Sequence, residues 1–161
     1  MTQLSGVVQA APDQANGFDS DTVVSATVAA QFFQQGYQFC LRYLSLGPTQ
    51  YGGDLSVGEA QNILAAGLAL MPVQHVPGGS WSPNGALGSE YGQHAAANAS
   101  SVGFPAGVNV WLDLEAVSPS AAAQDVIDYC NNWYHEVSSA GYVPGLYVGA
   151  SCCLNGQELY D

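Results

Sequence analysis

The feature that most constrains the fold of this chain is a regular alternation of two hydrophobic patterns. Short apolar runs predict strands, and stretches with apolar residues at helical spacing predict helices between them. The first expected strand ends at 17–19, and the others span 37–44, 68–76, 108–116 and 143–149. The expected helices span 25–35, 56–66, 90–101 and 120–140, and a further one begins at 157–161. Repeated strand–helix units with short links predict an α/β fold with a parallel sheet.

Two architectures contain such a sheet, the open doubly wound fold and the β/α barrel. Polar residues lie toward the C-terminal ends of successive expected strands: Asp19, Arg42, Gln74, Asp113 with Glu115, and Tyr147. In a β/α barrel these strand ends meet at one mouth. A doubly wound sheet usually carries a glycine-rich phosphate loop after its first strand, and no G-x-G-x-x-G follows here. We therefore predict a (β/α) fold of the TIM-barrel type with parallel strands in sequential order.

The length of the chain limits the number of strand–helix units that it can contribute to a barrel. A complete barrel needs about 250 residues, whereas 161 residues carry only enough pattern for about five of the eight units. We expect residues 1–161 to form one barrel domain that is incomplete at its C-terminus. An arc of this kind exposes unpaired strand edges. We therefore also expect homo-oligomers that form through the edges of the first and fifth strands.

The segment 109–116 ends in two carboxylates, Asp113 and Glu115. Side chains alternate between the two faces of a strand, so Trp111, Asp113 and Glu115 share one face, with the two acids about 6.5–7 Å apart along it. Acids on an apolar strand are costly unless something uses or satisfies them. Carboxyl pairs at such separations divide the catalytic roles in glycosidases. We expect Glu115 to stay protonated as the general acid and Asp113 to stay ionised; the alternative is that both bond to Arg42 and backbone amides.

The remaining candidate residues also have two interpretations each. Asp19 is a third candidate catalytic carboxylate, or a helix cap. Arg42 either holds a site carboxylate in its charged form or makes a structural ion pair. The other candidates for substrate binding suit hydrogen bonding and stacking with a sugar, or packing in the core; they are Tyr43, Gln74, Trp111 and Tyr147.

Composition excludes several classes of function. The net charge is −12, from 13 acids against a single base, which argues against neutralising the phosphates of a nucleic acid. With no lysine in the chain, a lysine-dependent phosphate loop or Schiff base is excluded. The four cysteines and three histidines have no metal-ligand spacing, so we expect no metal and no cofactor. No stretch is long enough for a membrane span, and the N-terminus lacks the pattern of a secretory signal, which leaves localisation open.

Short motifs on the successive strands resemble a bacterial group of glycoside-hydrolase-like TIM-barrel domains, formerly a domain of unknown function and related to the family 25 muramidases. The motifs are GFD at 17–19, CLRYL at 40–44, MPVQ at 71–74, WLDLE at 111–115 and GLYVG at 145–149. The resemblance implies a glycan substrate such as peptidoglycan, with Asp19, Asp113 and Glu115 in the catalytic pocket and Glu115 as the general acid. The chain departs from the muramidases after Asp19 and lacks the late strands, on which they place a further acid.

Three hypotheses for function follow. The first is a glycoside hydrolase that acts on peptidoglycan or a related polysaccharide through strand-end carboxylates. The second is a catalytically inactive carbohydrate-binding module of the same fold. The third is a small-molecule enzyme on an open doubly wound sheet, which would show a reversal in strand order.

Overall fold

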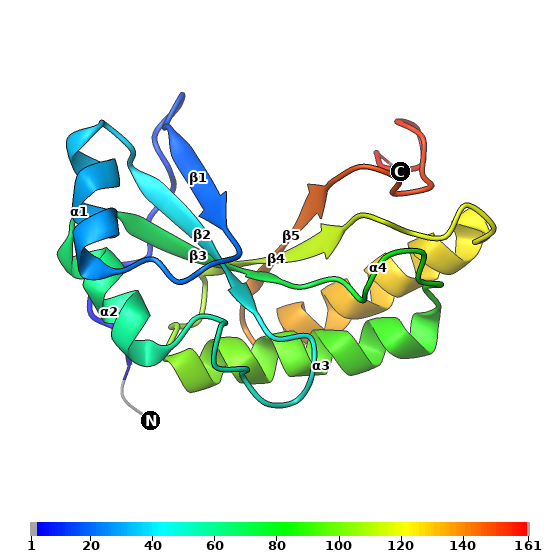
Figure 1. Cartoon of the computed structure of the whole chain (residues 1–161). Coiled ribbons are helices and arrows are strands. Elements are labelled where there is room, and N and C mark those ends of the chain that lie inside the picture. Colours follow the sequence, from blue (N-terminus) through cyan, green and yellow to red (C-terminus); the bar gives the residue numbers. More distant parts are fainter. Residues whose placement is uncertain (1–2, 161) are drawn as a thin grey trace.

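The computed structural model describes residues 3–160, in which five parallel strands form one sheet (Figure 1). The strands are β1 (Gly17–Ser20), β2 (Phe39–Leu44), β3 (Ala69–Gln74), β4 (Asn109–Leu114) and β5 (Val143–Val148). They are paired in the order β1-β2-β3-β4-β5. The sequential order confirms the predicted barrel-type arrangement. It also rules out the doubly wound alternative, which needs a reversal of strand order.

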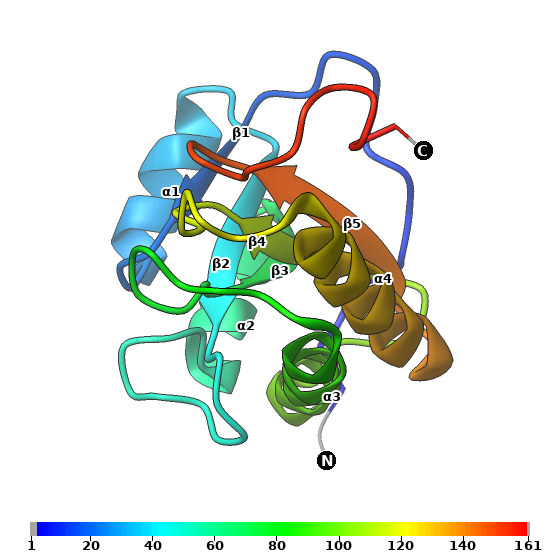
Figure 2. The same ribbon diagram turned by 90° about the vertical axis from the view of Figure 1, so that its right-hand side faces the viewer.

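Four helices connect the strands and cover the convex side of the curved sheet (Figures 1 and 2). They are α1 (Ala26–Gln34), α2 (Val57–Ala65), α3 (Gly85–Val102) and α4 (Ala123–Ser139). Helices α3 and α4 lie side by side in both views. Glycine makes their close approach feasible, because a Cβ on Gly88 would lie 2.3 Å from the Tyr129 carbonyl oxygen.

Helix starts follow from local capping. The Ser56 side chain accepts a hydrogen bond from the backbone N–H of Glu59, as expected for an N-cap. Asn84 caps α3 in the same way through Leu87. The predicted start of α3 at residue 90 was therefore too late, because the Asn84 cap was not recognised within a glycine- and proline-rich stretch. The helix expected from 157 onward was also wrong: residues 156–160 form turns, and residue 161 lies outside the described part.

The two faces of the sheet have different surroundings. On the convex face, alternate residues of the central strands pack under the helices with side chains that are almost fully buried, among them Cys40, Leu44, Val110, Leu112 and Leu114. On the concave face, the residues between them are covered less completely near the start of each strand. The core of the domain therefore lies between the sheet and its helices.

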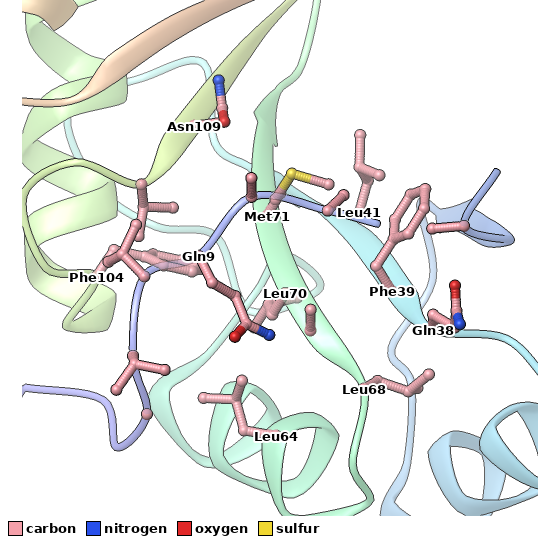
Figure 3. Close-up of a pocket in the computed structure, with 18 of the residues that line it drawn as sticks. Gln9, Gln38, Phe39, Leu41, Leu64, Leu68, Leu70, Met71, Phe104 and Asn109 are labelled. Carbon is pink, nitrogen blue, oxygen red and sulfur yellow. The ribbon is translucent and has the colours of Figure 1, made fainter. Parts of the chain in front are cut away.

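The concave face holds an apolar groove of about 1190 Å³ near the N-terminal ends of the strands. Figure 3 shows Phe39, Leu41 and Met71 among the side chains that line it, together with Gln9 of the N-terminal segment. That segment is attached at the same end by a hydrogen bond from the Leu4 backbone N–H to the Gly103 carbonyl, 2.9 Å. A complete barrel fills this interior with side chains from all its strands.

Candidate active site at the C-terminal ends of the strands

The inner face of the sheet brings polar residues from four strands together at their C-terminal ends. The strand register pairs Asp19 with Leu41, Tyr43 with Val73, and Asp113 with Tyr147. All of these residues fall on the same face, because positions two apart along a strand point the same way. The negative charges of Asp113, Asp19 and Glu115 all raise the pKa of Tyr43, after the larger effect of its burial. Of the residues predicted to meet at a barrel mouth, Asp19, Asp113, Glu115 and Tyr147 lie on this face, together with Tyr43.

Asp113 is the most perturbed acid of this group. Its side chain is buried, with the residue only 2% exposed, and its Oδ1 has no hydrogen-bond partner within residues 3–160. Burial raises the pKa of Asp113 to about 7, with further increases from Glu115 and Asp19 and a smaller decrease from a hydrogen bond with Tyr43. This shift disfavours the ionised form that was expected for Asp113. Burial without a cation leaves the protonated form favoured up to neutral pH.

Glu115 follows β4 and lies against the chain just after β5. A Cβ on Gly149 would be 2.6 Å from the Glu115 Cβ and 2.1 Å from its Oε2, so only glycine leaves room for this carboxylate. The Glu115 carbonyl accepts a hydrogen bond from Trp81 Nε1 at 2.9 Å. These contacts fix the chain at the point where the two acids, Asp113 and Glu115, are presented.

Two aromatic residues complete the inner face. The Trp111 ring covers Gly145, where a Cβ would lie 2.5 Å from the indole, and its Nε1 is buried with no partner in the described part of the chain. Tyr147 lies at the register position of Asp113. The charge of Asp19, more than burial, raises the pKa of Tyr147. Trp111 and Tyr147 also line the apolar groove, whereas Asp19, Asp113 and Glu115 are not among its lining residues.

Arg42 does not join this group. It makes the structural ion pair that was its alternative interpretation. Its side chain is fully buried on the convex face, where Nε donates to Glu59 Oε1 at 2.6 Å. Its other donors bond to the backbone carbonyls of Ser20 and Gly53. Even-numbered positions of β2 point toward the helices, so Arg42 faces away from Asp113 while its neighbour Tyr43 faces toward it.

Gln74 is likewise on the convex face. Its Oε1 accepts a hydrogen bond from Trp133 Nε1 at 2.7 Å, and its Nε2 donates to the Tyr91 carbonyl at 2.8 Å. Gln74 is a satisfied core amide that joins β3 to α3 and α4. A substrate role for Gln74 or Arg42 finds no support in these contacts.

His75, which the sequence analysis did not select, takes the inner position that Gln74 was expected to occupy. Its ring stacks on that of Tyr43, with centroids 4.4 Å apart and planes 24° from parallel. The period-two alternation along 71–75 was the signal available in the sequence, because residues 71, 73 and 75 share a face.

The described cysteines are all free thiols. Burial raises the pKa of both Cys40 and Cys130 to about 12. These two thiols are therefore protonated at neutral pH and behave as small apolar side chains. Among residues 3–160, no three acidic, histidine or cysteine side chains are arranged to hold a metal ion. No helix in that part is both long and apolar enough to cross a bilayer.

A curved parallel sheet in sequential order, with helices outside and carboxylates at the C-terminal strand ends, defines a protein of the β/α-barrel class with part of a barrel present. The chain belongs to the Rv2525c-like, glycoside hydrolase-like domain family, whose model matches residues 30–159. The predicted glycoside-hydrolase-like character is thereby confirmed. The closer relation to the family 25 muramidases stays a prediction. No curated protein matches the chain.

Solved structures show the same fold. An uncharacterised protein of B. stearothermophilus is 25% identical, with a TM-score of 0.63 over 81% of this chain and 58% of the other. The Tat-secreted protein Rv2525c of Mycobacterium tuberculosis is 14% identical, with a TM-score of 0.57 over 78% and 65%. A sugar phosphate isomerase/epimerase of Parabacteroides distasonis is 11% identical, with a TM-score of 0.62 over 92% and 58%. The chain thus spans less than two thirds of the length of these structures.

Proposed function

We propose that this chain is part of a glycoside hydrolase that acts on peptidoglycan or a related polysaccharide. The observation that carries the proposal is Asp113, a buried carboxyl group with an unpartnered Oδ1 and a pKa raised to about 7, beside Glu115 and Asp19. A carboxylic acid that keeps its proton near neutral pH can donate it to the leaving oxygen of a glycosidic bond.

Each inner-face residue then has a role. Asp113 gives its proton to the glycosidic oxygen as the bond from that oxygen to the anomeric carbon breaks. Water then adds to the anomeric carbon, and the proton that it releases restores the protonated carboxyl group. Glu115 and Asp19 supply negative charge that stabilises the positive charge developing on the sugar ring. Trp111 and Tyr147 offer aromatic surface on the same face for a pyranose ring. This proposal moves the proton-donor role from Glu115 to Asp113.

A neutral glycan fits the charge of the site better than a sugar phosphate does. The chain has one permanent cation, and Arg42 is committed to Glu59 and to two backbone carbonyls. The inner face therefore offers carboxylates where a phosphate would need cations. The similarity to the sugar phosphate isomerase/epimerase therefore concerns the fold and does not extend to the substrate.

The test is mass spectrometry of products released from peptidoglycan and from chitin oligomers by the wild type, Asp113→Asn and Glu115→Gln. We expect products from the wild type, a loss of at least about 100-fold in both variants, and a rate that falls as the pH rises through about 7, where Asp113 loses its proton. Asp128→Asn, on the exposed face of α4, is the matched control and should keep wild-type activity. Glycan binding without products would favour the carbohydrate-binding module, and neither binding nor products would contradict both.

We also propose that the protein self-associates through the open edges of its sheet. Within residues 3–160, β1 and β5 each pair on one side only, and the apolar groove lies on the face between them. Exposed edges and apolar surface favour association with another chain. We expect the 161-residue protein to form homo-oligomers in light scattering, and a stable monomer at high concentration would contradict this.

A further inference from the structure

Three polar side chains form a second cluster at the barrel mouth, beside the acids of the candidate active site. Ser45 and His75 come directly after β2 and β3, and Asp54 lies in the loop between β2 and α2. Asp54 bridges the other two: its Oδ1 lies 2.9 Å from His75 Nε2, and its Oδ2 accepts a hydrogen bond from the Ser45 hydroxyl. The roles proposed for the three inner-face acids make no use of this cluster.

The hydrogen bonds determine which nitrogen of His75 carries the ring proton. Ser45 Oγ accepts from the Tyr51 backbone N–H at 2.6 Å, and the Ser45 hydroxyl donates its own proton to Asp54. Asp54 is nearly buried, and its carboxylate has Oδ1 left to accept the proton on His75 Nε2. The neutral imidazole then has its lone pair on Nδ1. A carboxylate that holds one ring nitrogen as a donor thus leaves the other nitrogen as a base with a fixed direction.

The imidazole is the part of this Asp54–His75 dyad that solvent reaches. The His75 side chain is 35% exposed, whereas that of Asp54 is 9% exposed. Within residues 3–160, no group makes a hydrogen bond with His75 Nδ1. The ring also stacks on Tyr43, with centroids 4.4 Å apart, which limits its rotation. The dyad therefore offers an oriented base that no neighbour occupies, as general base catalysis requires.

The strand register places His75 next to Asp113 on the inner face. Val73 pairs with Trp111 at the C-terminal ends of β3 and β4. His75 and Asp113 each follow two residues later, so both point to the same side as that pair. His75 still pairs with β2, since its backbone N–H donates to the Leu44 carbonyl at 3.1 Å. Neighbouring strands lie about 4.8 Å apart, so the imidazole and the buried carboxyl group flank the same part of the mouth.

From this geometry we infer that His75 is the general base of the site, held by Asp54 as its positioning residue, and that it acts on the water that attacks the sugar. His75 Nδ1 takes one proton of that water as the water oxygen forms its bond to the anomeric carbon. The imidazolium then gives this proton up to Asp113, which has lost its own to the glycosidic oxygen. One water is consumed, and both groups return to their starting states. The assignment rests on the proposed function and adds a second proton-transfer group to it.

The test compares the kinetics of glycan hydrolysis for the wild type, His75→Gln, Asp54→Asn and Asp113→Asn. Glutamine is polar and of similar size but has no basic nitrogen, so His75→Gln should lower kcat at least about 100-fold and change KM by less than about two-fold. In Asp54→Asn, the amide oxygen accepts from Ser45 and the amide N–H donates to Nε2. The ring proton then moves to Nδ1, and kcat should again fall at least about 100-fold. His135→Gln, at an exposed position of α4, is the matched control and should keep the wild-type kcat.

A measurement without substrate checks the dyad itself. In ¹⁵N NMR at alkaline pH, where the imidazole is neutral, the His75 ring proton should lie on Nε2 in the wild type and on Nδ1 in Asp54→Asn. A wild-type proton on Nδ1 would overturn the inference, because that nitrogen could then not accept one from water. The same tautomer in both proteins would show that Asp54 does not position the ring, and it would overturn the inference as well.

Two kinetic results would overturn the inference and leave the proposed function in place. One is a folded His75→Gln with the wild-type kcat while Asp113→Asn is inactive. The other is a loss confined to KM, which would make His75 a binding residue. If His75→Gln does not fold, the kcat of Asp54→Asn decides, and a wild-type value there would have the same meaning. No products from the wild type would instead contradict the proposed function and, with it, this assignment.

Discussion

Arg42 and Asp113 are both buried on strands of the same sheet, but they lie on opposite faces and differ in how their charge is met. On the convex face, every bond that Arg42 makes is to a carboxylate or a carbonyl, including a 2.6 Å contact with Glu59. On the concave face, Asp113 has an oxygen without a partner in the described part of the chain and two further acids as neighbours.

The comparison distinguishes a charge that only holds the fold together from one that can still act on a ligand. A buried ion pair with all its hydrogen bonds made holds elements together and has nothing left to offer a ligand. A buried carboxyl group with a free oxygen and a raised pKa destabilises the fold when it ionises, and such groups concentrate at functional sites. The following predictions test whether the two faces differ in this way.

The largest effect is expected for Arg42→Met. The substitution leaves Glu59 buried without its cation, which should lower the free energy of unfolding by about 3–5 kcal/mol. Urea denaturation measures the loss. The double variant Arg42→Met/Glu59→Leu removes both charges and should recover most of the stability. A single variant as stable as the wild type would show that the pair does not hold the convex face together.

An effect of similar size and opposite sign is expected for Asp113→Asn. The folded-state pKa of Asp113, about 7, lies above the unfolded value near 4, so the wild type loses stability as the pH rises through that window. Asparagine does not titrate, and the variant should therefore be more stable than the wild type by about 4 kcal/mol at pH 8, with almost no such gain at pH 4. Urea denaturation at both pH values checks this, with Asp128→Asn as the exposed control. If the substitution changed the free energy of unfolding equally at both pH values, the pKa of Asp113 could not be raised in the folded protein.

The smallest effect is expected for Gln74→Met. It leaves the Trp133 indole N–H and the Tyr91 carbonyl without their partner, at a cost of about 1–2 kcal/mol in the free energy of unfolding. Glycan binding, measured by calorimetry, should stay unchanged because Gln74 faces the helices. Weaker glycan binding in a correctly folded variant would show that Gln74 contributes to the site, and it would contradict the proposed difference between the two faces.

Much of the fold followed from local pattern. Strand and helix periodicity predicted the elements and their type, and the helix expected from residue 56 has the Ser56 side chain as its N-cap. The start of α3 was missed because a single asparagine cap in a flexible-looking stretch carries little signal. Sequential strand order was predicted from the placement of polar residues, and the pairing order β1-β2-β3-β4-β5 confirms it.

For the site, the acids at 113 and 115 and the tyrosines at 43 and 147 could be selected because they share a face of their strands. Arg42 and Gln74 were selected with them only because they lie near the same strand ends. Applying the two-residue period from Tyr43 and Val73 would have placed both on the other face and would have suggested His75.

The sequence by itself determined the alternating elements, the parallel sheet and the scarcity of positive charge, because periodicity, capping and net charge are properties of neighbouring residues and of composition. Only the tertiary structure decided which charges are satisfied. Glu59 reaches Arg42 from 17 residues away and Asp54 reaches His75 from 21, whereas nothing reaches Asp113 Oδ1 from the described residues. The physical reason is that burial and pairing depend on what lies opposite a side chain in space, and the pKa of Asp113 follows from that environment.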